Sequence, residues 1–242
     1  MTEQPTEDVR ELMIVALARL LRNGETVFHG VASPLAMVAI LVAKRLHAPD
    51  LIYLKITGGV DSNPIPTAAS TVDPALLNGA RSMVTLTDLF DLAASGRLDT
   101  AFLSGVQIDG QGRINMSVIG DFAKPNVRLP GGAGSAAIMP KAGRTILWRT
   151  RHDRRVFVDK LDFVTAVGNV THVVTPKCVF ARIADRLHVE SIHPGVAPVD
   201  LAESTGFAVE AGVGTPRTPH PTDAELTAIA AVDPARVSLT EF

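Results

Sequence analysis

Glutamate is missing from the middle of this sequence, since none occurs between Glu25 and Glu190. A carboxylate that acts as nucleophile or base in this region must therefore be an aspartate, or must come from another chain. Cysteine is almost absent too, because Cys178 is the only one. A single cysteine excludes an intramolecular disulfide and a cysteine-based zinc site, and it favours a reducing, cytoplasmic location.

A membrane-spanning segment is also lacking. The longest apolar run, Pro34 to Ala43, is shorter than the about 20 residues needed to cross a bilayer. The first eleven residues are acidic and polar, unlike a secretory signal. Neither charge dominates: 23 basic and 25 acidic residues give a formal net charge of -2, without the excess of positive charge that binds nucleic acid. We therefore expect binding to neither membrane nor nucleic acid.

Apolar residues make up 46% of the 242 residues, enough for a large core. They recur at helical spacing over residues 9–21, and Ser33 and Pro34 have the pattern of an N-cap and a first helical residue. Apolar runs at residues 26–29 and 51–56 are typical of buried strands. The order helix, strand, helix, strand indicates a parallel α/β unit.

Two later features extend this prediction. Residues 145–148 and 156–158 are predicted to pair as a hairpin. Residues 211–242 are predicted to form a loop and a last helix, which Thr222 caps. No repeat or linker divides the chain, so we expect one α/β domain over residues 1–242, with an open, mostly parallel sheet flanked by helices.

A buried strand at residues 100–104 leads into a polar segment. Carboxyl ends of parallel strands usually present ligand contacts, so the polar side chains here are candidates for substrate binding. Turn chemistry that only shapes the backbone explains the same residues. The segment contains Gln107, Asp109, Asn115 and Asp121.

The sequence Gly131-Gly132-Ala133-Gly134 is a second candidate. Only glycine and alanine leave backbone N–H groups exposed closely enough to bind an anion or a developing oxyanion. The pattern matches neither the dinucleotide fingerprint nor the phosphate loop. An ordinary loop packed against a neighbouring strand remains the alternative.

His29 ends a predicted strand, where a general base could sit, although a hydrogen-bonded structural histidine produces the same pattern. The seven histidines contain no closely spaced pair, so no metal site is predicted. Ser33 lacks a Gly-x-Ser-x-Gly elbow, and no catalytic triad can be assigned. We expect substrate contacts from four residues: Gln107, Asn115, Ser33 and His29.

Several short motifs are spread along the chain, among them Asn23-Gly24-Glu25, Gln107-Ile108-Asp109, Ile119-Gly120-Asp121, Gly131-Gly132-Ala133 and Arg154-Arg155. Taken together they resemble the β-type subunit of family I CoA-transferases, in the glutaconate CoA-transferase branch, over nearly the whole chain. The resemblance implies an open α/β fold, an obligate α-type partner in an α2β2 heterotetramer, and an active site at the subunit interface that handles acyl-CoA thioesters. Coenzyme A is then part of the substrate, and no cofactor is permanently bound.

The resemblance also implies roles for the glycine-rich loop. The amides of Gly131, Gly132 and Ala133 face the thioester carbonyl oxygen as an oxyanion loop. The backbone at Gly131, Gly132 and Gly134 contacts the coenzyme.

One departure from the family concerns the nucleophile. In the transferases the second strand ends in a Glu-Ser-Gly type sequence, whose glutamate attacks the thioester and carries coenzyme A covalently. A gap-free count from Ala48-Pro49-Asp50 puts Ile56 at that position, and isoleucine cannot be a nucleophile. The chain is therefore similar to the CoA-transferase-like hydrolases that open carbon rings, where water attacks. Asp61 is the nearest carboxylate that could act as base, although Asp61-Ser62-Asn63-Pro64 is also a good turn.

Three functions stay open at this point. The leading prediction is hydrolysis or C–C ring cleavage of an acyl-CoA without a glutamyl-CoA intermediate. The second is a true CoA-transferase, whose carboxylate comes from the partner or from an aspartate. The third is a non-catalytic sugar-phosphate or effector-binding module, since the same kind of fold serves that purpose.

Overall fold

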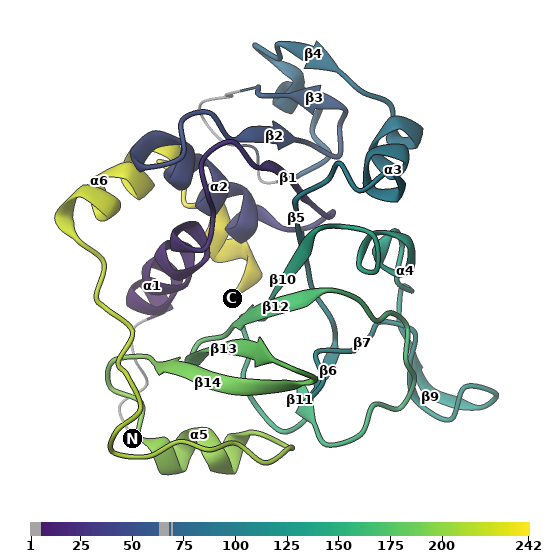
Figure 1. The fold of residues 1–242 in the computed structure, drawn as a ribbon, viewed down its shortest axis with the longest axis vertical. Coiled ribbons are helices and arrows are strands. Elements are labelled where there is room, and N and C mark those ends of the chain that lie inside the picture. Colours follow the sequence, from purple (N-terminus) through teal and green to yellow (C-terminus); the bar gives the residue numbers. More distant parts are fainter. Residues whose placement is uncertain (1–5, 63–67, 69) are drawn as a thin grey trace. The chain divides into compact units, whose positions relative to one another are not determined.

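Figure 1 shows the computed structural model of the chain, which describes residues 6–62, 68 and 70–242. The chain divides into two compact units. The first unit comprises residues 1–102 and 220–242, and the second comprises residues 103–219. The prediction that residues 1–242 form a single domain stays a prediction. None of the helices in the described ranges is long and apolar enough to span a bilayer.

In the described residues of the first unit, the strands follow the order β5-β1-β2-β3-β4. β1 pairs in parallel with both β2 and β5, while β3 and β4 add antiparallel pairs at the edge. β1 is buried from Val27 to His29, as expected of a central parallel strand, whose faces are covered by the crossover helices. The strands are β1 (Thr26–His29), β2 (Ile52–Leu54), β3 (Gly59–Val60), β4 (Ser82–Met83) and β5 (Thr100–Leu103).

Helix α2 is the central helix of the first unit. Its residues 34–43 are all buried, since it contacts β1, α1, α6 and η2. It begins after Ser33 with Pro34, as predicted, and α6 begins with the predicted capping box of Thr222 and Glu225. The helical elements are α1 (Thr6–Arg19), α2 (Pro34–Leu46), η1 (Pro74–Leu77), α3 (Leu86–Ala94), α6 (Asp223–Val232) and η2 (Val237–Glu241).

A buried ion pair ties α1 to the C-terminal segment of the same unit. The Arg10 guanidinium donates to Asp233 at 3.3 Å and to the Ser238 hydroxyl at 3.0 Å. Asp233 also accepts the backbone N–H of Val237 at 2.7 Å. Both charged side chains are almost fully buried, and the guanidinium also lies 3.3 Å from the more exposed Glu11 carboxylate, so the charge is balanced where it is removed from water.

The second unit contains a sheet of order β14-β13-β12-β10, a small sheet β11-β6-β7 and the two-stranded ribbon β8-β9. Helices α4 (Ser135–Ile138) and α5 (Pro198–Ser204) complete it. With parallel pairs inside and antiparallel pairs at the edges, the predicted α/β class is confirmed. The strands are β6 (Gln107–Asp109), β7 (Ile114–Asn115), β8 (Val118–Gly120), β9 (Pro125–Arg128), β10 (Arg144–Trp148), β11 (Phe157–Val158), β12 (Val170–Val174), β13 (Cys178–Ile183) and β14 (Arg186–Ile192).

The predicted hairpin of residues 145–148 and 156–158 is wrong. β10 pairs in parallel with β12, and β11 pairs in parallel with β6, so the two strands have different partners. The segment between them contains His152, which is buried and lies 2.8 Å from Thr175 and 3.0 Å from Thr205. Arg151, Arg154 and Arg155 on either side of it are exposed, so only His152 anchors this segment in the core while the two strands pair elsewhere.

Candidate functional site

A first group of candidate residues lies where β1 and β2 end. Phe28 is paired with Leu54 in parallel register, so the residues that follow, His29 and Lys55, come to the same edge of the sheet. His29 is fully buried. Its Nδ1 lies 2.9 Å from the Ser33 hydroxyl, and its Nε2 is hydrogen-bonded to the hydroxyl of Tyr53. The structure therefore brings two predicted residues, His29 and Ser33, into direct contact.

Burial dominates the protonation of this cluster. It lowers the pKa of His29 to about 4, with a raising contribution from the Gly30 carbonyl and a further lowering by the Lys55 charge. It raises the pKa of Tyr53 well above its usual value. Neutral His29, with both nitrogens hydrogen-bonded, has the contacts of a structural histidine that connects β1 to β2. Contact of His29 or Ser33 with substrate stays a prediction.

Tyr53 and Lys55 are members of this cluster that sequence reasoning missed. The Lys55 ammonium is buried, donates to the Ser62 carbonyl at 2.9 Å and lies 4.9 Å from the centre of the Tyr53 ring. Burial lowers its pKa to about 8, although the Asp61 charge raises it. The available signal was a lysine beside the only tyrosine of the chain, inside an otherwise apolar run.

Asp61 is held in place by two contacts within the first unit. Its carboxylate accepts the Lys44 ammonium at 2.9 Å and the backbone N–H of Tyr53 at 2.9 Å. Its φ of 52° is left-handed, which a non-glycine residue rarely adopts. These contacts fix the chain that follows β2 against Tyr53 and Lys44. A role of Asp61 as a base stays a prediction. Of the predicted turn, Asn63 and Pro64 lie outside the described residues.

Ile56 lies in the turn directly after β2 and is partly exposed. The side chain is therefore outside the fully buried core that Tyr53 and Leu54 occupy. A position of this kind can contact a ligand or a partner subunit, and it tolerates a polar substitution better than a core position does.

A second group of candidate residues belongs to the second unit. Gln107 and Asn115 face each other across β6 and β7, and the Asn115 amide donates to the Gln107 amide oxygen at 2.7 Å. Gln107 in turn donates to Asp162 at 3.0 Å, and Asn115 donates to the Val118 carbonyl at 2.6 Å. Both amides are buried and used within the chain, so their direct contact with substrate stays a prediction.

The glycine-rich loop is anchored at its start. Leu129 donates its N–H to the Ser117 carbonyl at 3.0 Å, and Gly131 donates to the Met116 carbonyl at 2.7 Å. Gly131 has a φ of 92° and Ala133 one of 44°. Left-handed backbone at a non-glycine residue costs energy and is concentrated at functional sites.

Beyond this anchor the loop offers free donors. Across the described ranges of the chain, the N–H groups of Gly132 and Ala133 have no hydrogen-bond acceptor. Both residues are at least partly accessible. Two adjacent unpaired N–H groups form a geometry that can bind an oxyanion.

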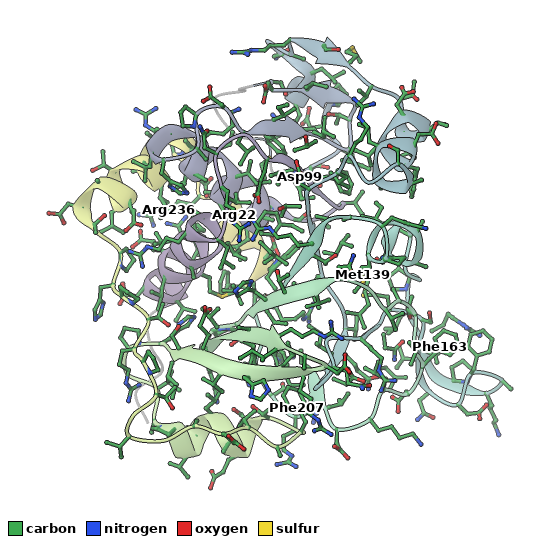
Figure 2. The ribbon with its side chains drawn as sticks, viewed as in Figure 1. Arg22, Asp99, Met139, Phe163, Phe207 and Arg236 are labelled. Carbon is green, nitrogen blue, oxygen red and sulfur yellow. The ribbon has the colours of Figure 1, made fainter. Side chains whose placement is uncertain are left out.

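The ribbon β8-β9 carries exposed aromatic and basic side chains. Phe122 stacks on Phe163, with 4.8 Å between ring centres, and the Arg128 guanidinium lies 5.0 Å from the Phe122 ring centre. Figure 2 labels Phe163 beside this ribbon. Asp162 accepts the Gly120 N–H at 3.2 Å, which connects the ribbon to the Gln107 network.

No metal site is formed by the part of the chain that the structure describes, because its His, Cys, Asp and Glu side chains do not gather in threes.

The family model described as coenzyme A transferase matches residues 10–203 of the chain. This chain belongs to the coenzyme A transferase family. The predicted family is confirmed, and since members of this family are enzymes, the chain is an enzyme subunit.

Among curated relatives, the chain is similar to the B component of 3-oxoadipate CoA-transferase from Pseudomonas knackmussii, with 33% identity over 92% of each chain. It is also similar to the IpdB component of the cholesterol ring-cleaving hydrolase from Mycobacterium tuberculosis, with 29% identity over 92% of this chain and 93% of the relative.

Two solved structures share the fold over nearly the whole chain. The decarboxylase AibA/AibB matches with a TM-score of 0.91 and 34% identity, covering 96% of this chain and 98% of the other. Glutaconate coenzyme A-transferase from Acidaminococcus fermentans matches with a TM-score of 0.86 and 25% identity, covering 96% of each. The predicted CoA-transferase-like α/β fold is confirmed.

Proposed function

We propose that this chain is the β-type subunit of a heteromeric enzyme that acts on an acyl-CoA thioester. The reaction is hydrolysis or C–C cleavage, and no glutamyl-CoA intermediate forms on this subunit. Coenzyme A takes part as a portion of the substrate.

The glycine-rich loop supports action on a thioester. When a nucleophile attacks a thioester or when charge moves onto its carbonyl oxygen, the negative oxygen needs donors that are already in place. The unpaired N–H groups of Gly132 and Ala133 are such donors. Gly131 and Gly134 keep the backbone free of side chains on either side, which leaves room for the coenzyme.

The proposed reaction type depends on the residue at position 56. In the gap-free count it stands where the transferases have their glutamate, and its partly exposed side chain at the end of β2 has no group that can attack. Two similar proteins are named for reactions other than transfer, a ring-cleaving hydrolase and a decarboxylase. Both names describe breaking a bond in a substrate, which agrees with an isoleucine at this position.

An α-type subunit is the expected partner, in an α2β2 heterotetramer. Two of the similar proteins are named as single subunits of an enzyme, and the AibA/AibB structure has a name of two components. The partner is the source we expect for a carboxylate base, since Asp61 is paired with Lys44 and no glutamate occurs between Glu25 and Glu190 of this chain. The cytoplasmic location stays a prediction.

A true CoA-transferase is the second candidate. The relative at 33% identity is a transferase subunit, which is the observation in its favour. The attacking carboxylate would then come from the partner or from an aspartate of this chain, because Ile56 cannot supply it.

The two candidates are separated by supplying or withholding an acceptor acid. The chain is co-expressed with its α-type partner, and the complex is incubated with 3-oxoadipyl-CoA or glutaconyl-CoA, with and without acetate and succinate. Release of free coenzyme A or a change in the acyl skeleton without an acid supports the proposal. Thioester turnover that occurs only with an added acid, and yields the new acid's thioester, contradicts it and supports the transferase.

A further inference from the structure

Thr165 lies next to the glycine-rich loop and is tied to the chain beneath it. Its hydroxyl accepts the backbone N–H of Met116 at 2.8 Å and is 2.7 Å from the hydroxyl of Ser117. It also lies 3.5 Å from the Asn115 amide oxygen. These contacts leave the Thr165 side chain one rotamer, since rotation about its first bond would remove the hydroxyl from all of them.

The two residues that Thr165 holds are the ones that anchor the loop. The Met116 carbonyl accepts the N–H of Gly131, and the Ser117 carbonyl accepts the N–H of Leu129. The hydroxyl of Thr165 therefore acts on the loop indirectly, through Met116 and Ser117. Displacing Met116 or Ser117 displaces both anchors at once.

The methyl group of Thr165 touches the loop directly. A Cβ added to Gly132 would lie 2.6 Å from the Thr165 Cγ2, far inside contact distance. The next nearest atom, the Ser135 Cβ, is at an ordinary 3.8 Å. Thr165 alone therefore requires glycine at position 132, because its anchored methyl group fills the space that a side chain would need.

We propose that Thr165 is the positioning residue of the oxyanion loop. Its hydroxyl holds Met116 and Ser117, which anchor the loop, and its methyl group sets how closely the Gly132 backbone packs against Thr165. Together these contacts orient the N–H groups of Gly132 and Ala133. The inference rests on the proposed function for the loop's role toward the thioester, but the positioning itself can be measured without any substrate.

The test is a double-mutant cycle in the complex with the α-type partner. Gly132→Ala introduces the close contact, and Thr165→Ser removes the methyl group while keeping the hydroxyl. Gly132→Ala alone should lower kcat about 10- to 100-fold, within the range for a disturbed oxyanion donor, with little change in KM. Adding Thr165→Ser should return kcat to within about threefold of Thr165→Ser alone, because the two sites are coupled.

A second arm separates the hydroxyl from the methyl group. Thr165→Val keeps the methyl groups and leaves the Met116 N–H without its acceptor, so the loop anchors should loosen. Hydrogen exchange of the complex, followed over residues 129–135, measures the loosening of the loop directly and needs no substrate turnover. Exchange should rise at least about tenfold. Thr227→Val, on the exposed face of α6, is the matched control and should change neither exchange nor kcat.

The outcomes are distinct. If the double variant is no better than Gly132→Ala in kcat, or if Thr165→Val exchanges like the wild type, the positioning role is wrong. If Thr165→Val exchanges faster as expected while the wild-type complex turns over an acyl-CoA only with an added acceptor acid, the proposed function is contradicted and the positioning role is supported.

Discussion

At the scale of single residues, Ile56 excludes a glutamyl-CoA intermediate at this position of the subunit. The wild-type subunit should form no covalent adduct with coenzyme A, so its mass after incubation with acyl-CoA and borohydride should be unchanged. Ile56→Glu places a carboxylate in a partly exposed turn, where the cost of removing it from water is limited. We expect the folded complex of this variant to become trappable with coenzyme A, as measured by the mass of the subunit.

The matched control is Ile52→Glu at the other end of β2, an exposed isoleucine of the same strand. It should fold and remain unreactive. Trapping of coenzyme A on the wild-type subunit would overturn the count that places Ile56 at the nucleophile position. A trappable Ile56→Glu subunit would show that the side chain faces the reacting thioester.

Three buried histidines give the chain a defined pH dependence. Burial lowers the pKa of His29 to about 4, of His152 to about 3 and of His193 to about 4, while the unfolded chain keeps the ordinary 6.5. Below pH 6.5 the unfolded chain therefore binds more protons than the folded one, and stability falls as the pH falls toward 4. Each histidine should cost roughly 0.8 kcal/mol between pH 7.5 and pH 6.0.

Urea unfolding at pH 7.5 and pH 6.0 measures this loss. His152→Gln should reduce the difference between the two pH values by about a third, whatever its effect on absolute stability, because one of three groups no longer titrates. An unfolding free energy that is equal at both pH values would contradict the burial of these side chains.

At the scale of elements, the ion pairs that join α1 to the C-terminal segment should differ in strength. Arg10 and Asp233 are almost fully buried, and Asp233→Asn replaces the buried carboxylate while the more exposed Glu11 carboxylate stays 3.3 Å from the guanidinium, so the variant should cost about 3 kcal/mol. Arg19 forms a more exposed pair with Glu225 of α6, at 2.7 Å, and Arg19→Ala should cost at most about 1 kcal/mol. Denaturant unfolding of the two variants beside the wild type measures both values. Equal losses would contradict the assigned burial of the Arg10 pair.

The C-terminal segment also caps the central helix of the first unit. Ser33 makes no side-chain cap hydrogen bond at the start of α2, and the Leu35 N–H instead donates to the Glu241 carboxylate at 2.6 Å. A carboxylate at a helix N-terminus is stabilising because it pairs with the free N–H groups and the positive end of the dipole. The start of α2, which Ser33 and Pro34 mark in the sequence, is thus capped by Glu241, more than 200 positions away.

At the scale of the whole molecule, the surface indicates a subunit that needs its partner. Large apolar side chains are more than 45% exposed in both units, among them Val31, Met83, Leu86, Phe122 and Val127. We expect the chain expressed alone to aggregate and to lack thioester turnover, and co-expression with the α-type partner to give a monodisperse, active complex. Size-exclusion chromatography with light scattering, together with the acyl-CoA assay, measures both. A monodisperse and active preparation of this chain alone would contradict the expectation.

The sequence by itself determined the features that depend on neighbours along the chain. Pro34 opens α2, Thr222 and Glu225 cap α6, and the apolar run at 26–29 is a buried strand, because the fixed φ of proline, the capping box and hydrophobic periodicity act within a few residues. The glycine-rich loop was visible for the same reason, since exposed amides require small residues in a row.

Only the tertiary structure decided which distant groups meet. Tyr53 and Lys55 join His29 because β1 and β2 are adjacent, and Thr165 reaches the loop from 33 positions beyond Gly132. The segments at 145–148 and 156–158 look like a hairpin until their separate parallel partners are known. Contacts of this kind depend on how the chain packs over long distances, where the free energy of burial outweighs local preference.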